Sequence, residues 1–506
     1  MVRVSDIIPL SEVEKWKADD IVLVNAGTGQ GKTTFVKEVL IEYCKQNDKT
    51  ILFLVNRIAL KKQTKKDIEK KERNLIRNVR LTSYQAITRL LLKNKSIAQF
   101  DYIVCDETHW FFSDALFNNT TDLMWNWLFS NNSSIKVLMT ATAILPKKYI
   151  KEVAKKKVKE YKLNTNYNKF IKSLYFYKND KTIEQILFNL PKGEKAIYFC
   201  GAEKAYKISK LLPDAKFYCS ENNKLYKYAD KNTFKSIIEN MKFDCLILCT
   251  TSVLDNGVNF LDTSIKHIII DYFDLDEIQQ MIGRKRLLSD DSDNFILYIR
   301  NRTNADLNRI LNTKNYQLRQ AEDLEDNGEI EFTNKYFKKS VNTTIDTYTG
   351  EDNQIHRKVN KMMYTKIQNL IEQLQKMLKR KKEGYKYAVI TRLKYNKKNV
   401  IDLDSELDGS ILQEYLDSLI GVKLFKEEQK RFKAFLTTSD DLFNPAKTDH
   451  NSLGINSING YFRDNGLAYV VESNIENSRK SDNYKKTYWM IGKIDFAKKI
   501  PSVIYL

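Results

Sequence analysis

A glycine-rich loop between an apolar run and a helix-like run constrains the fold of this 506-residue chain more than any other feature. The loop, residues 25–34, follows the apolar residues 21–24 and precedes the helix-like residues 35–44. A strand that passes through such a loop into a helix is typical of a β-α-β unit. Its glycines let backbone N–H groups gather at a helix N-terminus, where anions bind. The sequence therefore predicts a parallel sheet with an anion site at its edge.

Short apolar runs recur along the first 300 residues and predict the rest of the architecture. Two sets of four runs are each followed by polar or helix-like segments, as expected of buried strands in parallel sheets. The runs are residues 21–24, 51–55, 102–105 and 136–139, and then 196–199, 245–248, 267–270 and 294–298. A lysine-rich stretch, residues 147–172, separates the two sets. We therefore expect an α/β fold with two tandem domains, residues 1–146 and 147–312.

Beyond residue 300 the pattern changes to helices. Seven apolar residues at near-heptad spacing predict a long helix that ends before Gly384, within a helical connector of residues 313–400. These residues are Ile355, Val359, Met362, Ile367, Leu370, Leu374 and Met377. The basic residues 379–382 fit a phosphate contact, although a solvated face is the commoner explanation. Residues 401–506 are expected to form a small, basic α+β domain.

The composition excludes some classes of protein but does not identify one. The chain has 84 Lys and Arg residues against 64 Asp and Glu, a net charge of +20, which fits a polyanionic partner but also AT-rich coding. Six cysteines without a C-x-x-C pair predict reduced, buried thiols and no zinc site. The first residues lack a secretory signal, and no run of about 20 apolar residues predicts a membrane span. We therefore expect a soluble, cytoplasmic protein.

The glycine-rich loop fits the phosphate-binding pattern G-x-x-x-x-G-K-[ST], except that Ala26 stands at the first position. In this pattern Lys32 reaches the β and γ oxygens of a nucleoside triphosphate, and Thr33 ligates Mg²⁺. ATP and Mg²⁺ are thus the expected cofactors. The residues predicted to contact the nucleotide here are Ala26, Gly27, Thr28, Gly29, Gln30, Gly31, Lys32, Thr33 and Thr34.

An acidic pair, Asp106 and Glu107, follows the apolar run at residues 102–105. At the end of a buried strand, Asp106 would hold Mg²⁺ and Glu107 would orient and deprotonate an attacking water. Alone, such a pair is usually a surface turn. Together with the loop at Lys32, it predicts hydrolysis of a nucleoside triphosphate.

With His109 the acidic pair forms a DExH box, and the chain here resembles the superfamily 2 helicases. The other boxes of that family are matched in order over residues 20 to 300: residues 56–60 resemble motif Ia, 81–85 motif Ib, 139–142 motif III, 197–201 motif IV, 249–259 motif V and 280–286 motif VI. The resemblance implies two tandem RecA-like parallel-sheet domains, a helical connector and a small α+β winged-helix-like domain.

The resemblance also implies roles for residues of both domains. Gln280, Arg284 and Arg286 would approach the γ-phosphate from the second domain, with Arg284 as the arginine finger, and Gly257 and Asn259 of motif V would also contact the nucleotide. Thr140, Thr142 and His109 would relay between the nucleotide and the bound strand. Motif VI lacks the second glycine of the family pattern, which leaves the position of Arg286 open. A shortened box of this kind resembles that of some phage and viral helicases, which implies the cytoplasm of a bacterium or of a phage-infected host. No glutamine-containing adenine-recognition motif precedes the loop, so other nucleotides are expected to be accepted.

The family architecture places a nucleic-acid strand across both domains, opposite the nucleotide. By motif position, Arg57, Thr82 and Thr251 are the expected contacts. Local capping is the alternative explanation for the two threonines. Binding of ATP is expected to close the domains on the strand, and hydrolysis to reopen them.

The last fifty residues carry a second signal. A short helix within residues 453–463, a strand at 466–471, a polar stretch at 474–486 and a strand at 487–491 resemble a winged-helix module. Arg479 and Lys480 would then touch DNA phosphates from the wing. The alternative is a fold of this kind that only braces the core or binds a protein.

These observations predict an ATP-dependent DNA helicase or translocase that acts as a monomer on nucleic acid and not at a membrane, with DNA favoured over RNA. Two alternatives stay open: an RNA helicase, and an ATP-gated protein that recognises a DNA origin or junction without unwinding it.

Overall fold

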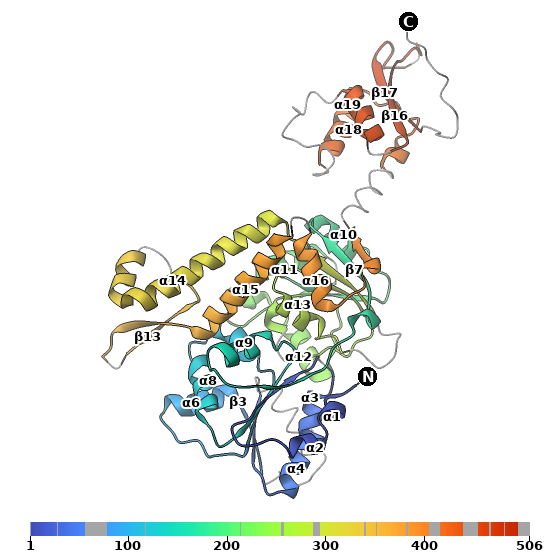
Figure 1. The fold of residues 1–506 in the computed structure, drawn as a ribbon. Helices are drawn as coiled ribbons and strands as arrows, with labels where there is room; N and C mark the ends of the chain where they lie inside the picture. Colours follow the sequence, from blue (N-terminus) through green and yellow to red (C-terminus); the bar gives the residue numbers. More distant parts are fainter. Residues whose placement is uncertain are drawn as a thin grey trace. The chain divides into compact units, whose positions relative to one another are not determined.

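The structure is a computed structural model, and it divides into two compact units, Met1–Ile401 and Asp402–Leu506 (Figure 1). It describes residues 2–27, 29–55, 78–116, 118–212, 214–254, 258–286, 294–337, 341–350, 352–380, 383–403, 415–438, 454–464, 467–479 and 481–493. The first unit contains two parallel sheets, so the expected fold class of two tandem parallel-sheet α/β domains is confirmed.

The first sheet has six strands in the order β3-β2-β4-β5-β1-β6, and every neighbouring pair is parallel. The strands are β1 (Ile21–Asn25), β2 (Ile51–Val55), β3 (Val79–Ser83), β4 (Tyr102–Cys105), β5 (Ile135–Thr140) and β6 (Lys159–Lys162). Because β6 pairs with β1, this sheet extends past residue 146, where the sequence suggested that the first domain ends. The exposed, lysine-rich pattern of β6 hides an edge strand from an analysis based on apolar runs.

Helices cover both faces of the first sheet. Side chains of β1 alternate between two cores: Ile21 and Leu23 belong to one, and Val22 and Val24 to the other. The helical segments are α1 (Val4–Ile7), α2 (Leu10–Val13), α3 (Lys32–Phe35), a π-helical turn η1 (Val36–Leu40), α4 (Ile41–Gln46), α6 (Tyr84–Leu92), α7 (Trp110–Ser113), η2 (Asp114–Leu116), α8 (Thr121–Ser130) and α9 (Ile144–Glu152).

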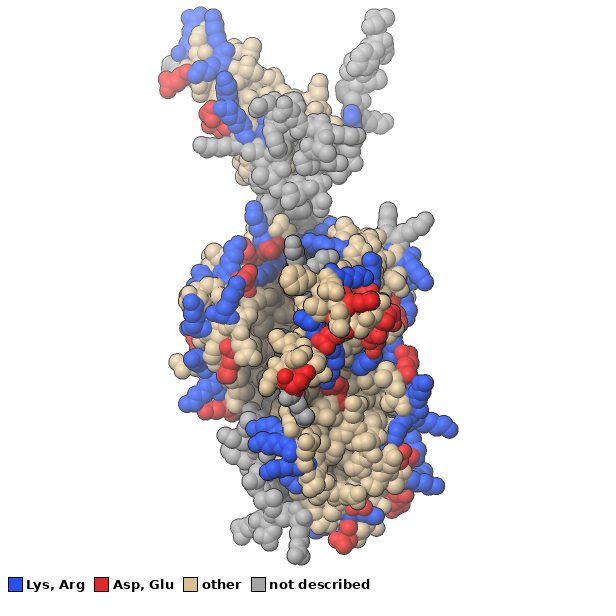
Figure 2. Space-filling model, turned by 90° about the vertical axis from the view of Figure 1, so that its left-hand side faces the viewer, with Lys and Arg blue, Asp and Glu red and all other residues tan. Residues whose placement is uncertain are grey.

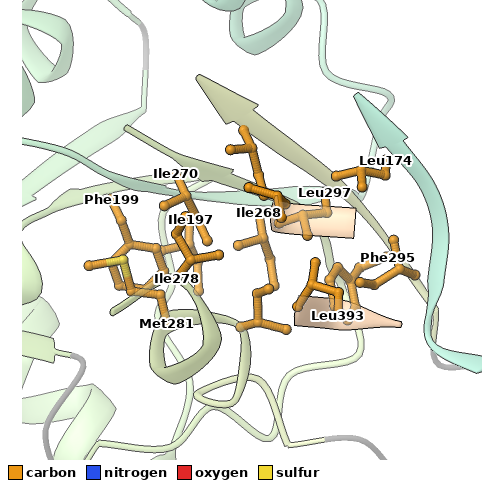
Figure 3. Packing of buried hydrophobic residues seen from close by; sticks show 14 of the residues in the cluster. Leu174, Ile197, Phe199, Ile268, Ile270, Ile278, Met281, Phe295, Leu297 and Leu393 are labelled. Carbon is orange, nitrogen blue, oxygen red and sulfur yellow. The ribbon is translucent and has the colours of Figure 1, made fainter. Parts of the chain in front are cut away.

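The second sheet has seven strands in the order β15-β7-β12-β11-β8-β10-β9, and the pairs from β7 to β9 are parallel. The strands are β7 (Ile171–Tyr177), β8 (Lys195–Phe199), β9 (Ala215–Tyr218), β10 (Ile247–Thr250), β11 (Ile265–Ile270), β12 (Phe295–Arg300) and β15 (Val400–Asp402). The helical segments are η3 (Tyr167–Lys169), α10 (Asp180–Phe188), α11 (Ala202–Leu211), η4 (Tyr226–Tyr228), α12 (Lys231–Asn240), η5 (Ser252–Leu254) and α13 (Leu275–Ile282). Ile278 and Met281 of α13 pack against Ile197 and Phe199 of β8 (Figure 3).

A helical region with a hairpin follows the second sheet. It comprises α14 (Asn304–Tyr336), which bends at Gly328, the antiparallel strands β13 (Ile345–Thr349) and β14 (Ile355–Val359), and the helices α15 (Lys361–Lys379) and α16 (Gly384–Leu393), followed by η6 (Lys397–Asn399). The expected long helix is therefore correct from Met362 to Met377, but Ile355 and Val359 lie in a strand. Asn360 explains the boundary, because its side chain accepts a hydrogen bond from the backbone N–H of Met363 and caps α15.

Helix α15 packs into both parallel-sheet domains. Four of its residues belong to a core of the first domain: Met362, Met363, Ile367 and Ile371. Three others belong to the core of the second domain: Leu370, Leu374 and Met377. One rigid element thus joins the two domains through apolar contacts.

The C-terminal unit has its own small core. It contains α18 (Lys426–Thr438), α19 (Ile455–Asp464) and an antiparallel hairpin of β16 (Tyr469–Ile475) and β17 (Thr487–Lys493). Val471, Trp489 and Ile491 of the hairpin pack with Ile458 and Phe462 of α19. Arg479 is exposed in the hairpin connection, and Lys480 lies outside the described residues.

All six cysteines are buried and free, as expected. Among the described residues, no helix has the length and apolarity needed to cross a membrane.

Candidate active site

The loop after β1 has the geometry of an anion site. Gly31 immediately precedes α3, and both Gly29 and Gly31 have φ of 82°, where a side chain is strained. Lys32 begins the helix, is 7% exposed, and donates from Nζ to the backbone oxygens of Ala26 at 2.9 Å and Gly27 at 3.3 Å. Thr33 and Thr34 follow in the first turn of α3, whereas Thr28 lies outside the described residues. The Lys32 ammonium group therefore lies inside the loop, where we expect it to bind phosphate.

Residues from elsewhere in the first unit hold this loop. Gln30 accepts a hydrogen bond from the Gly27 N–H, and its Nε2 donates to Asn164 O at 3.3 Å. The N–H of Val4, at the start of α1, donates to Gln30 O at 3.0 Å. The N-terminal helix and the segment after β6 thus both hold the loop in place. The sequence of the loop does not indicate these two contacts.

The acidic pair lies at the same edge of the sheet. In register, Asn25 of β1 pairs with Thr140 of β5, and Cys105 of β4 pairs with Leu138 of β5, so the ends of these strands are neighbours. Asp106 is 4% exposed, and Glu107 has a left-handed backbone with φ of 51°. Such a conformation is uncommon for a glutamate and is typical of functional sites.

The two carboxyl groups differ in their ease of ionisation. Burial, together with the charge of Glu107, raises the pKa of Asp106 to about 6. Burial also opposes ionisation of Glu107, but Lys32 and His109 outweigh it and lower the Glu107 pKa. Glu107 Oε2 lies 3.3 Å from His109 Nδ1. Glu107 is therefore the carboxyl group of the pair that ionises more readily. Its basicity, and with it its ability to accept a proton from water, rises when Lys32 binds another anion.

A chain of side chains runs from the acidic pair to the second domain. His109 Nδ1 is 3.3 Å from Thr140 Oγ1, which also accepts from the backbone N–H of Thr142 at 3.0 Å. Thr142 Oγ1 in turn accepts from Gln280 Nε2 of α13 at 3.1 Å. The predicted relay residues are thus brought together across the two domains.

The two arginines of the second domain lie close to the phosphate loop and the acidic pair. Arg284 follows α13 and is 3% exposed, and its Nε has no hydrogen-bond partner among the described residues. A methyl group placed on Gly29 would lie 3.6 Å from Arg286 Nη1, so Arg286 covers the loop. Phe260 ties this segment to the residues after β10, because its N–H donates to Arg284 O and its carbonyl accepts from Arg286 N, both at 2.8 Å.

Like charges in the cleft repel one another in the absence of an anion. Burial lowers the pKa of Lys32 despite the attraction of Glu107 and Asp106, and both arginines lower it further. Burial, and then repulsion from Arg284, lowers the pKa of Arg286 to about 10. Three cations from two domains and two carboxylates of the first domain thus form one buried cluster, whose charges are complementary to a polyphosphate with a divalent cation.

Motif V is described only in part. Asn259 Oδ1 is buried and makes no hydrogen bond within the described part of the chain, whereas Gly257 lies outside it. No group of three or more potential metal-binding side chains occurs among the described residues. A Mg²⁺ ion here would therefore rely on few protein oxygens, with Asp106 and Thr33 as the donors, and on phosphate and water, as is usual for this ion.

A cavity lies between the two domains, next to the chain of side chains that links His109 to Gln280. It has a volume of about 520 Å³, and its lining includes His109, Thr142, Thr251 and Gln280. Thr251 Oγ1 accepts from the Val253 N–H at 3.3 Å, which is the capping role considered as the alternative. Thr82 is buried at the end of β3, and Arg57 lies outside the described residues.

Two residues of this site carry no motif signal. Gln279 Nε2 donates to Ala141 O at 3.4 Å, across the domains, and its Oε1 accepts from Arg392 Nε of α16 at 2.9 Å. The only sequence signal for a role of Gln279 at this site is its position next to Gln280, and this signal is weak. Nothing in the sequence links Arg392 to the site.

Residues 6–145 match the family model described as type III restriction enzyme, res subunit. No curated protein sequence matches the chain. Among solved structures, the chain is similar to S. cerevisiae Dbp5 bound to RNA and ADP BeF3, with 15% sequence identity, 62% of this chain and 86% of that chain covered, and a TM-score of 0.44. It is also similar to a DEAD box protein from the hyperthermophile Methanococcus jannaschii, with 17% identity, 61% and 89% coverage and a TM-score of 0.34. The family match spans the loop at Lys32 and the acidic pair.

Proposed function

We propose that this chain is a nucleic-acid-stimulated ATPase of helicase superfamily 2, which acts as a monomeric DNA helicase or translocase. The observation that carries the proposal is a buried charge cluster, in which Lys32 and Glu107 of the first domain interact electrostatically with arginines of the second domain, Arg284 and Arg286. The family match over residues 6–145 supports the ATPase half and, since its description is that of a restriction enzyme subunit, favours DNA.

In the proposed reaction, Lys32 exchanges the carbonyls of Ala26 and Gly27 for oxygens of the β and γ phosphates. Thr33 and Asp106 would hold Mg²⁺, which would supply neutralisation of phosphate charge when bound. Glu107 accepts the proton of a water that attacks the γ-phosphorus, and the bond to the β-phosphate oxygen breaks to give ADP and inorganic phosphate. Arg284 and Arg286 stabilise the charge on the transferred group.

Coupling to movement follows from the contacts between the domains. Gln280 of the second domain donates to Thr142, whose N–H donates to Thr140, and Thr140 contacts His109. The ionisation of the acidic pair is thereby linked to the contact between the two domains. Loss of the γ-phosphate removes the anion that holds the three cations together. Their repulsion then favours opening, which releases the strand and permits one step per cycle.

The path of the strand is proposed to cross the relay side of the cleft. Thr82, Thr251 and Arg57 are the proposed contacts on the basis of the motifs that contain them. Figure 2 shows a face on which basic and acidic side chains are interspersed between uncharged areas. We expect the strand to be held by local contacts to its phosphates.

The C-terminal unit is proposed to be a winged-helix-like DNA-binding module. Its hairpin connection exposes Arg479, Lys485 and Lys486, as a phosphate-contacting wing requires. Truncation after Thr438 should weaken binding to forked DNA, measured by fluorescence anisotropy, while basal ATP hydrolysis is retained. Unchanged DNA affinity would favour a bracing role instead.

The proposed function is tested by ATP hydrolysis titrated with single-stranded DNA, duplex DNA and RNA. We expect stimulation by DNA, and loss of hydrolysis in Lys32→Ala and Glu107→Gln. Full activity in either variant would refute the catalytic assignment. Strand displacement on forked DNA and on RNA duplexes, with and without ATP, then distinguishes a DNA helicase from an RNA helicase and from an ATP-gated binding protein.

A further inference from the structure

Arg392 lies outside the helicase motifs but contacts the helix that carries motif VI. It occupies the last turn of α16, and its guanidinium forms an ion pair with Asp276 of α13. Its Nε also donates to Gln279 Oε1 at 2.9 Å. The Arg392 side chain is only 18% exposed, so both contacts are largely shielded from water.

These contacts determine which way the Gln279 amide faces. An arginine side chain only donates hydrogen bonds, and a backbone carbonyl only accepts them. Because Arg392 occupies Gln279 Oε1, the NH₂ group of the same amide is turned toward Ala141 O, 3.4 Å away in the first domain. The opposite orientation would set the amide nitrogen against the guanidinium and the amide oxygen against the carbonyl. Arg392 therefore favours the orientation that joins the domains, beside the Tyr167 hydroxyl, which also hydrogen-bonds with the Gln279 side chain.

The contact made by Gln279 adjoins the relay. Gln279 and Gln280 are consecutive, and they donate to the consecutive residues Ala141 and Thr142 at the end of β5. Arg392 also lines a cavity of about 140 Å³ together with Gly27 of the phosphate loop. The guanidinium thus lines the same cavity as the loop and motif III but donates to none of their described residues.

Helix α16, which carries Arg392, is anchored to the core of the second domain. Leu393, next to Arg392, packs in the second-domain core with Ile268 and Leu297 (Figure 3). Tyr385 at the start of the helix is 1% exposed, and its hydroxyl donates to Tyr272 O at 3.1 Å. Arg392 is therefore placed by the second-domain core rather than by a loose surface contact.

We propose that Arg392 is a positioning residue for ATP turnover, which acts by orienting Gln279 so that motif VI engages motif III. This inference rests on the proposed ATPase function. Because Arg392 acts through Gln279 and donates to none of the described residues of the phosphate loop, its loss lowers kcat more than it changes the KM for ATP.

The test is a double-mutant cycle of ATP hydrolysis in the presence of poly(dT), with poly(U) as a second stimulator. Arg392→Ala and Gln279→Ala should each lower kcat about tenfold, as expected for loss of a charge-assisted hydrogen bond, and the double variant should also lose about tenfold rather than a hundredfold. The KM for ATP should change less than about twofold. Arg392→Lys, which keeps a donor, should recover part of the activity. Lys376→Ala, an exposed lysine of α15, is the charge-matched control.

Hydrogen–deuterium exchange of peptides covering residues 139–145 gives a readout that needs no activity. Exchange should be faster in Arg392→Ala and Gln279→Ala and unchanged in Lys376→Ala. Wild-type kcat and exchange in Arg392→Ala, or multiplied effects in the double variant, would overturn the inference. If wild-type protein and the Lys376→Ala control both fail to hydrolyse ATP, the proposed function fails, while the exchange data still decide whether Arg392 orients Gln279.

Discussion

Helix α15 offers a sharp test of how tightly the two parallel-sheet domains are joined. Leu374 is 0% exposed in the core of the second domain, whereas Met363 and Ile367 of the same helix are buried in the first. Truncation of a fully buried leucine to alanine costs about 2–5 kcal/mol. For Leu374→Ala we expect about 3 kcal/mol, which at a urea dependence of about 3 kcal/mol/M lowers the unfolding midpoint by about 1 M.

The tryptophans make the first domain visible by itself. Of the five in the chain, Trp16, Trp110, Trp125 and Trp127 belong to the first domain, and Trp489 belongs to the C-terminal unit. In a Trp489→Phe background, fluorescence therefore reports unfolding of the first domain, and far-UV circular dichroism reports the whole chain. We expect Leu374→Ala to shift both midpoints together, because α15 shares its stability with both cores.

The reasoning would be refuted by a separation of the two signals. If Leu374→Ala shifts the circular dichroism transition while the fluorescence midpoint stays at the wild-type value, α15 does not couple the domains. Gln375→Ala, an exposed neighbour on the same helix, is the control and should shift neither midpoint.

Two further predictions concern the cleft and a buried histidine. Gly29→Ala should lower ATP affinity, measured by titration with a fluorescent ATP analogue, because an alanine is strained at φ of 82°; unchanged affinity would argue against the loop geometry. His267 is held neutral because burial lowers its pKa, despite a 2.7 Å contact of its Nε2 with Glu194 Oε2. Its contribution to stability should therefore be complete above the unfolded pKa of about 6.5 and be lost as pH falls below that value, since only the unfolded state gains the proton readily. Urea midpoints at pH 7.5 and 5.5 should differ less in His267→Gln than in wild type, and an equal pH dependence would contradict the assignment.

The sequence was sufficient to predict the parts of the site that lie at strand ends. The loop at Lys32 and the pair Asp106 and Glu107 follow buried strands, and parallel pairing brings their carboxyl ends to one edge. Arg284 could be expected opposite them only through the family resemblance. The position of Arg286, which the shortened motif VI left open, is set by backbone pairing with Phe260, a contact between segments that local patterns do not connect.

Other features depend on contacts between distant residues and were not predictable. Arg392 and Gln279 are 113 positions apart, and no periodicity marks their pairing. Ile355 and Val359 fit a helical seam by spacing, but they lie in a hairpin strand because β13 pairs with them. A spacing of four residues is compatible with one face of either a helix or a strand, so the period alone did not distinguish them.

The central claim is that one triphosphate lies between Lys32 and the two arginines of the second domain. The most direct measurement is a crystal structure with Mg²⁺ and a non-hydrolysable ATP analogue. The account predicts that Lys32 Nζ and the guanidinium of Arg284 both lie within hydrogen-bond distance of the terminal phosphate. A terminal phosphate contacted from the first domain alone, with Arg284 and Arg286 directed away from the cleft, would contradict it.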